Sequence, residues 1–233
     1  MKIIIGQGSC GIASGAKKTE EEFRKVLAAE NLDVKVDFTG CVGTCYLEPI
    51  VDIYDDNGEM TRYVKVQPDK VQAIVDGHVK GGKPVEELAI GADDETFIGK
   101  QQRVVLNKCG IINPEEIDDY IAVGGYDATR KVVTSMSPDE VIDVIKVSGL
   151  RGRGGAGFPT WFKWDAAKNN ASDEKYIVCN ADEGDPGAFM DRAVLEGDPH
   201  SVLEGMIICG FAMGATEGII YCRAENPLAI KRL

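Results

Sequence analysis

The sequence predicts an α/β fold in two domains, residues 1–90 and residues 97–233. Short apolar strand-like runs alternate with amphipathic helical stretches in both halves. Between the halves, Gly81-Gly82-Lys83-Pro84 and the polar stretch that continues to Glu95 are typical of a linker. A chain of 233 residues is also long enough to bury a sizeable core in one or two domains.

In the first half, strands are expected at Lys2–Ile5, Val34–Phe38, Ile50–Tyr54 and Arg62–Val66. The last two flank Asp55-Asp56-Asn57-Gly58, a hairpin signal because Asn-Gly tolerates positive φ. Thr19 and Glu22 have the spacing of a capping box, and Pro68 opens a helix that runs to about Val79. The order β-α-β-β-β-α around a cysteine-containing loop is thioredoxin-like in outline.

In the second half, Asn113-Pro114 and Ser137-Pro138 each combine an N-cap residue with Pro at the first helical position. Ser137 with Glu140 forms a second capping box, and that helix should end at Gly149. The remaining expected elements are a buried strand at Tyr176–Cys179, a helix from His200 to about Met213, and a strand at Gly218–Cys222.

Charge and composition exclude several classes of protein. The net charge is −12 and no basic cluster occurs, which argues against a nucleic-acid partner. No apolar run approaches the roughly 20 residues that span a bilayer, so direct membrane insertion is not expected. The apolar start Met1–Gly6 is too short for a signal peptide, which favours a cytoplasmic location. There, the seven cysteines are expected to be thiols or metal ligands before disulfides.

A glycine-rich loop follows the expected helix end at Gly149. Gly152, Gly154 and Gly157 satisfy the dinucleotide pattern G-x-G-x-x-G, but the loop follows a helix, whereas a Rossmann loop follows a strand. Backbone amides with Arg151, Arg153 and Lys163 could form an anion cradle suited to a phosphate. Nearby aromatic residues could face a planar ring, namely Phe158, Trp161, Phe162 and Trp164. The alternative is a plain glycine-rich surface turn.

An acidic loop follows the strand expected at Tyr176–Cys179. It carries Asn180, Asp182, Glu183 and Asp185 before Pro186-Gly187. Ligands bind at the carboxyl ends of strands in open α/β sheets, and these side chains can hydrogen-bond ribityl or ribose hydroxyls and the imide edge of a flavin. A solvated acidic turn and a cation site are the alternatives, although the spacing fits no calcium loop.

Together these segments carry a resemblance. Ser148–Pro159, followed by Cys179–Gly187, resembles the NADH-binding flavoprotein subunit of respiratory complex I and its soluble relatives, the beta subunits of electron-bifurcating hydrogenases and NAD-linked formate dehydrogenases. The likeness spans about Gln101–Leu233 and includes Ile117–Tyr126. It implies that residues 97–233 are the first part of a complex-I-type FMN- and NADH-binding domain.

The resemblance also implies site residues. Six residues of the glycine loop would hold FMN, and three of the acidic loop would bind the rest of the flavin. They are Gly152, Arg153, Gly154, Gly155, Ala156 and Lys163, then Asn180, Asp182 and Glu183. Phe158 would stack on NADH and Asp185 would also contact it. The implied reaction is hydride transfer between NADH and FMN, with the chemistry supplied by the flavin.

The chain departs from the family pattern in two ways. Trp161 stands where the family usually has Gly. The family's later segments are absent, namely a second glycine-rich stretch with paired glutamates, the cysteines of a [4Fe–4S] centre and the C-terminal domains. We therefore expect a fragment, or a chain whose site another chain completes, with any [4Fe–4S] centre in the missing part or in partner subunits.

Residues 1–90 resemble the thioredoxin-like [2Fe–2S] domain that accompanies these flavoproteins. Cys41 and Cys45 fit its second cysteine pair; Cys10 is the only cysteine of the first, because Ile5 stands at the partner position. The resemblance implies a [2Fe–2S] cluster with these three cysteines as metal ligands, and Ser9 is the nearest conceivable oxygen ligand. The competing interpretation is a domain that kept the fold but lost the metal.

The other potential ligands are interpreted as structural. Buried thiols are common as small apolar residues, which is the role expected for Cys109, Cys179, Cys209 and Cys222. His78 and His200 show no ligand pattern.

The leading hypothesis is thus a flavoprotein subunit of a multi-subunit NAD(H) oxidoreductase that passes electrons to iron–sulfur centres, including flavin-based bifurcation within a hydrogenase. Its partners would be other subunits that carry iron–sulfur clusters. The rival is a non-catalytic assembly or electron-relay module without flavin.

Overall fold

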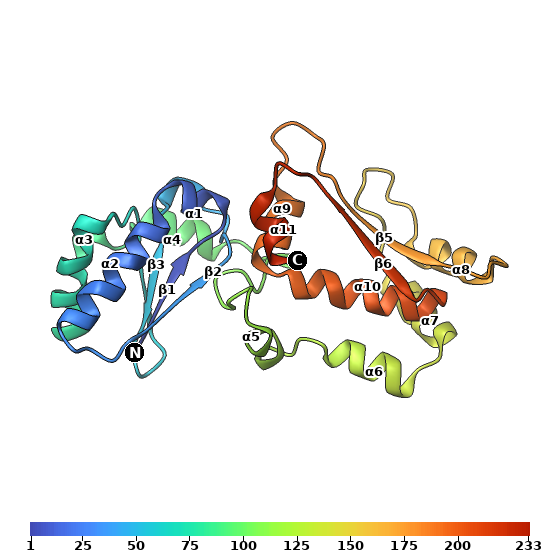
Figure 1. Cartoon of the computed structure of the whole chain (residues 1–233), viewed down its shortest axis with the longest axis horizontal. Helices are drawn as coiled ribbons and strands as arrows, with labels where there is room; N and C mark the ends of the chain where they lie inside the picture. Colours follow the sequence, from blue (N-terminus) through green and yellow to red (C-terminus); the bar gives the residue numbers. More distant parts are fainter. The chain divides into compact units, whose positions relative to one another are not determined.

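The computed structural model describes every residue from Met1 to Leu233 and divides the chain into two units (Figure 1). Unit 1 contains Met1–Glu116 and two later segments, Ala193–Asp198 and Lys231–Leu233. Unit 2 contains Ile117–Arg192 and Pro199–Ile230. The expected boundary at residues 90–97 does not coincide with this division, and as a boundary between family modules it stays a prediction.

Unit 1 is built on a four-stranded mixed sheet of order β2-β1-β3-β4. Its strands are β1 (Lys2–Gly6), β2 (Lys35–Thr39), β3 (Val51–Tyr54) and β4 (Met60–Tyr63). β1 pairs parallel with β2 and antiparallel with β3, and β3 pairs antiparallel with β4 through the predicted hairpin, where Gly58 has φ +86°. This is the thioredoxin-like arrangement that the sequence predicts.

The helices of unit 1 bury one face of this sheet. α2 (Ala16–Ala29) and α3 (Pro68–Ile74) contribute Phe23 and Val71 to a core that contains Ile3, Ile5 and Ile53. The remaining helical elements are α1 (Ser9–Ala13), η1 (Cys45–Leu47), η2 (Val75–Lys80, a π-helical continuation of α3), η3 (Glu86–Leu88) and α4 (Ala92–Gly99). Ile98 of α4 packs against a smaller cluster around Val42, which places this part of the expected linker in unit 1.

The predicted capping box at Thr19 and Glu22 is wrong. α2 begins at Ala16, so Thr19 already lies within its helical turns. The Thr19 hydroxyl donates a 2.8 Å hydrogen bond to the carbonyl of Val66, a buried acceptor that no helix or strand ladder satisfies. The local pattern assigned the Thr19 side chain to a helix cap, but it binds Val66, which is distant in the sequence.

Unit 2 places helices against a small sheet. Its elements are α5 (Ile117–Ala122), α6 (Asp127–Ser135), α7 (Pro138–Ser148), α8 (Thr160–Asn169), β5 (Tyr176–Ala181), α10 (Pro199–Met213) and β6 (Glu217–Cys222). α9 (Met190–Gly197) and α11 (Pro227–Arg232) each begin in unit 2 and end in unit 1 segments. A core cluster joins Val132, Val141, Ile142 and Ala212 from α6, α7 and α10.

Two helix starts in this region have different outcomes. The capping box of Ser137 with Glu140 is confirmed, and α7 ends at Gly149 in a left-handed conformation of φ 67°. The helix start predicted at Asn113-Pro114 is wrong, since the next helix begins at Ile117. Asn113 Oδ1 accepts the amide of Glu115 at 2.9 Å, as a cap would, but the chain makes only a turn there, and the side-chain amide donates to the buried carboxylate of Asp37 at 2.7 Å.

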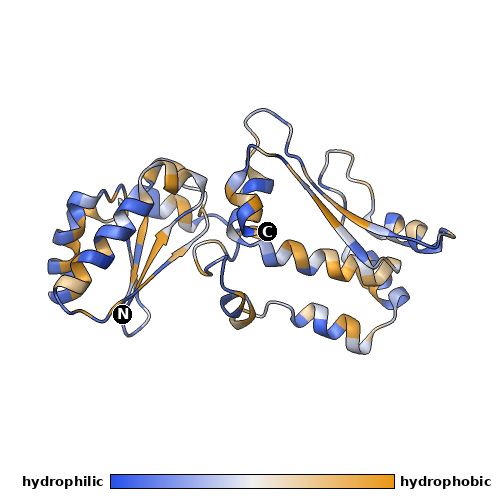
Figure 2. Cartoon of the chain, viewed as in Figure 1, coloured by the Kyte–Doolittle hydropathy of each residue, from blue (hydrophilic) through white to orange (hydrophobic).

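β5 and β6 form a two-stranded parallel sheet that is covered on one face only. Ile177 points toward α10 and is 8% exposed, whereas its neighbour Val178 is 61% exposed, so the prediction of a buried strand is right in position and wrong in burial. We call Tyr176, Val178, Ile219 and Tyr221 the outer face of this sheet. Figure 2 shows the apolar character of both strands and of α10. No helix of the chain has the length and apolar character that crossing a membrane requires.

Candidate functional site

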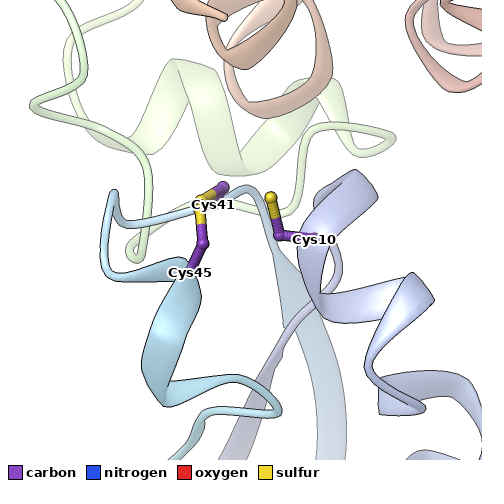
Figure 3. Close-up of side chains that lie close together, drawn as sticks. All are labelled: Cys10, Cys41 and Cys45. Atoms are coloured by element: carbon purple, nitrogen blue, oxygen red, sulfur yellow. Dashed lines mark hydrogen bonds between the residues drawn. The ribbon is translucent and has the colours of Figure 1, made fainter. Parts of the chain in front are cut away.

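Three cysteine side chains meet where β1 and β2 give way to the loops that follow them. Cys10 comes from α1, and Cys41 and Cys45 flank the loop between β2 and η1 (Figure 3). Their sulfur atoms all lie within 4.8 Å of one another, and the Sγ atoms of Cys41 and Cys45 are 3.6 Å apart. None of the three is in a disulfide. The structure therefore brings together the three metal ligands that the sequence predicts.

The surroundings of these thiols favour a bound cation over a free thiolate. Burial raises the pKa of the Cys41 thiol, and a 3.3 Å hydrogen bond from the amide of Gly43 opposes that rise. Burial likewise raises the pKa of Cys45. A thiolate in such a setting needs a positive partner, which a coordinated metal supplies as the thiol loses its proton.

The chain has two buried side-chain oxygen atoms without a hydrogen-bond partner, and both belong to this loop region. They are Oγ1 of Thr44, between Cys41 and Cys45, and Oε1 of Glu48. Burial raises the pKa of Glu48 to about 7. Buried polar atoms almost always have partners, so two orphans beside three convergent thiols fit a group bound among them.

Neither Ile5 nor Ser9, the two positions considered for a fourth ligand, is available to bind a metal. Ile5 is fully buried in the core of unit 1. Ser9 donates its backbone amide and its hydroxyl to the carboxylate of Glu196, at 2.8 and 2.5 Å. The structure thus leaves Cys10, Cys41 and Cys45 as three thiol ligands without Ser9.

Sequence reasoning missed the segment that encloses this region of unit 1. Glu196 is 2% exposed, and Arg232 donates a hydrogen bond to its carbonyl and a 3.1 Å bond to the carbonyl of Gln7. A Cβ on Gly40, next to Cys41, would lie 2.3 Å from the Cα of Gly197, so the two backbones pack in direct contact. Nothing in the local sequence signals these contacts, because the partners are distant in the chain.

The glycine loop of unit 2 is closed at its base and open at its tip. Gly152 donates to the carbonyl of Phe158 at 2.8 Å, and Thr160 donates to the carbonyl of Leu150 at 3.1 Å. The amides of residues 153–157 donate no hydrogen bond within the chain, and a Cβ on Gly154 or Gly155 would meet nothing within 4 Å. These amides are free to bind an anion, as the cradle hypothesis requires.

Some side chains around this loop contact the backbone or the core of the protein, and others are exposed and could meet a ligand. Arg151 turns back to donate to the carbonyl of Gly157. Lys163 extends over the half-exposed ring of Phe158, with Nζ 5.6 Å from the ring centroid. Trp161 packs on the core cluster of unit 2, with the Lys146 Nζ 4.6 Å from its ring centroid, so it does not crowd the loop.

The acidic loop is organised by its own side chains. Asn180 Oδ1 accepts the amide of Asp182 at 3.1 Å. The Glu183 carboxylate accepts the amides of Asp191 and Arg192 at 2.7 and 3.0 Å and so caps the start of α9. No hydrogen bond or ion pair joins this loop to the glycine loop. The predicted flavin contacts of both loops therefore stay predictions, and the carboxylate of Glu183 already has a structural role.

The remaining cysteines are at least partly buried, and both histidines are hydrogen-bonded to tyrosines. Burial raises the pKa of Cys109 and Cys209 to about 11 and that of Cys179 and Cys222 by less, as expected of packed thiols. The Nδ1 atoms of His78 and His200 lie 2.8 Å from the hydroxyls of Tyr63 and Tyr126.

Fold and site together define a class of α/β protein in which a thioredoxin-like ferredoxin domain precedes part of a flavin-binding domain. Residues 145–233 match the family described as the Nuo51 FMN-binding domain. The chain resembles the N-terminal portion of NADH-quinone oxidoreductase and HndC subunits.

Two curated relatives illustrate the likeness. The NADP-reducing hydrogenase subunit HndC of Solidesulfovibrio fructosivorans is 66% identical over 134 residues, which cover 58% of this chain and 27% of that protein. An NADH-quinone oxidoreductase subunit of Escherichia coli (strain K12) is 44% identical over 84 residues, covering 36% of this chain and 19% of that protein. The chain thus spans about a quarter or less of their lengths.

A solved structure is similar to part of the chain. The thioredoxin-like [2Fe–2S] ferredoxin of Aquifex aeolicus is 27% identical, with a TM-score of 0.35, and covers 39% of this chain and 95% of its own.

Proposed function

We propose that this chain is part of a flavoprotein subunit of a multi-subunit NAD(H) oxidoreductase. The observation that carries the proposal is the open tip of the glycine loop, whose amides at residues 153–157 are unpaired beside Lys163 and the exposed ring of Phe158. Unpaired amides next to a fixed cation suit a phosphate, and an exposed aromatic ring suits a planar cofactor.

In this proposal the residues of unit 2 bind and orient FMN and NADH, and the two cofactors supply the reactivity. The unpaired amides of residues 153–156 would hold the phosphate of FMN, with Gly152 at the base of the loop and Arg153 and Lys163 as counter-charges. Asn180, Asp182 and Glu183 would contact the rest of the flavin. Phe158 and Asp185 face NADH. FMN supplies the acceptor for a hydride from the nicotinamide, and can pass the electrons on singly. The carboxylate of Glu183 must leave the α9 amides or bind through its backbone.

The three-cysteine site of unit 1 is the proposed electron exit within this chain. Cys10, Cys41 and Cys45 hold a [2Fe–2S] cluster, which is supported by their convergence and by the unpaired oxygens of Thr44 and Glu48. The partners are further subunits with iron–sulfur clusters, in a hydrogenase or a related complex, with bifurcation as one mode of action. The seven free thiols agree with a cytoplasmic location.

The test is the absorption spectrum of the chain and of the complex that contains it. Bound oxidised flavin gives a visible band that NADH should bleach. A colourless complex with full subunit content would overturn the proposal.

The second candidate is an assembly or electron-relay module without flavin. It is favoured by the lack of any hydrogen bond or ion pair between the glycine and acidic loops. The same spectra decide between them, because a relay module shows iron–sulfur absorption without a flavin band.

A further inference from the structure

Glu48 is a buried carboxylate with one oxygen left unpaired. Its side chain is 7% exposed and follows η1, the short helix that begins at Cys45. Oε2 accepts the amide of Ile50 at 2.8 Å, whereas Oε1 is shielded from solvent and has no hydrogen-bond partner. An unpaired buried carboxylate oxygen is costly, so a bound group that pairs with it would recover that free energy.

Two glycines create the space that this carboxylate fills. A Cβ on Gly6 would lie 3.0 Å from both carboxylate oxygens of Glu48, and a Cβ on Gly11 would lie 3.1 Å from Oε2. Gly6 ends β1, and Gly11 follows Cys10 in α1. The carboxylate therefore lies against the connection between β1 and α1, the region that carries Cys10 and the residue at the missing cysteine position, Ile5.

We propose that Glu48 provides the fourth ligand, through Oε1, of the iron–sulfur cluster held by Cys10, Cys41 and Cys45. This inference rests on the cluster assigned to unit 1 under the proposed function. A [2Fe–2S] cluster needs four protein ligands, and a non-cysteine ligand can replace a thiolate. Glu48 lies outside the group of three sulfurs, which are all within 4.8 Å of one another.

The neighbouring groups are weaker candidates. Ser9 is bound to Glu196, and Ile5 has no ligating atom. Thr44 Oγ1 is also unpaired, but it is a neutral hydroxyl, and carboxylates are the stronger anionic ligands. Glu48 is thus the ligand that the burial, charge and space in this region favour.

The test uses the purified 233-residue chain, reconstituted anaerobically with ferrous iron and sulfide. Wild type should take up iron and sulfide in equal amounts, and its Mössbauer spectrum should show two inequivalent ferric sites. Glu48→Gln keeps the size and the acceptor for Ile50 but removes the charge. It should weaken iron retention roughly tenfold or more, because even groups outside the first ligand shell are worth about 10- to 100-fold.

The matched control is Glu21→Gln, an exposed glutamate on α2, which should retain wild-type iron and spectra. Far-ultraviolet circular dichroism of the metal-free variants checks that Glu48→Gln keeps the fold, since a neutral amide is easier to bury than a carboxylate. Glu48→Gln with wild-type iron content and an unchanged Mössbauer spectrum overturns the ligand assignment but leaves the cluster standing. Loss of iron in Thr44→Val with retention in Glu48→Gln also overturns it. A wild-type chain that takes up no iron overturns the cluster itself.

Discussion

The carboxylate of Glu196 holds Ser9 by two hydrogen bonds, from the Ser9 amide at 2.8 Å and from its hydroxyl at 2.5 Å. Ser9 is the first residue of α1 and precedes Cys10. The first amides of a helix have no partner within the helix, so the carboxylate acts as a cap supplied from 187 residues further along the chain. It fixes the start of the helix that presents Cys10.

Removal of this cap should destabilise unit 1. Glu196→Ala eliminates a buried, charged acceptor of two hydrogen bonds, and we expect the free energy of unfolding to fall by about 2 kcal/mol. Glu196→Gln, which can still accept one of the bonds, should lose less. Chemical denaturation followed by circular dichroism measures both, with Glu21→Ala on the exposed face of α2 as the control. An alanine variant as stable as wild type would show that the cap contributes nothing.

Lys163 is expected to contribute to flavin retention. If its ammonium pairs with the FMN phosphate, Lys163→Ala removes a charge-assisted hydrogen bond of about 1.5–3 kcal/mol. That loss corresponds to roughly ten- to a hundredfold weaker flavin binding. Flavin content is measured by fluorescence after release from the intact complex, with Lys131→Ala on the exposed side of α6 as the control. Equal flavin in both variants would remove Lys163 from the site.

The stability of unit 1 should fall in acid through His78. Burial lowers the pKa of His78 below its ordinary value of 6.5. The Tyr63 hydroxyl oxygen accepts the amide of Val85 at 3.0 Å and lies 2.8 Å from Nδ1 of His78. Because the unfolded chain binds the proton more readily, this contribution is complete above pH 6.5 and is lost as pH falls toward the lowered pKa.

The contribution of His78 to stability can be measured from unfolding curves of wild type and His78→Gln, recorded from neutral pH downward. The difference in stability between the two should shrink as pH falls below 6.5. A difference that stays constant with pH would contradict the assignment of a neutral, hydrogen-bonded imidazole.

The outer face of the β5–β6 sheet should bind hydrophobic dyes in the 233-residue chain. Ile219 is 51% exposed, so Ile219→Thr should change stability by no more than about 0.5 kcal/mol while it lowers dye binding and aggregation. Ile177, on the covered face, is 8% exposed, and Ile177→Thr should cost about 1–3 kcal/mol because it leaves a hydroxyl among apolar side chains. Equal costs for the two variants would show that both faces are covered.

The features that the sequence predicted correctly are those that neighbouring residues determine. Asn57-Gly58 requires positive φ, so the hairpin follows from two residues. Ser137, Glu140 and Gly149 mark both ends of α7 by hydrogen bonds and φ values confined to one helix. The convergence of Cys10, Cys41 and Cys45 was expected from the resemblance to a thioredoxin-like [2Fe–2S] domain and is observed, whereas their role as metal ligands stays a prediction.

The errors have a common physical cause in distant partners. The Thr19 hydroxyl can cap a helix, but it binds the carbonyl of Val66. Asn113 does accept the amide of Glu115, but its side chain is also held by Asp37, and no helix starts there. Likewise, the apolar run of β5 indicates a strand but not how many of its faces another layer covers. Glu48 and Glu196 were missed because no local pattern distinguishes a buried glutamate from a surface one.

Unit 1 takes its last pieces from residues 193–198 and 231–233, which the ribosome makes long after residue 116. At about 5–20 residues per second, the 77 residues from 116 to 193 (193 − 116) take roughly 4 to 15 seconds to synthesise. During that interval Ser9 lacks Glu196 and Gly40 lacks Gly197, so unit 1 reaches its complete set of contacts only after most of unit 2 has been synthesised.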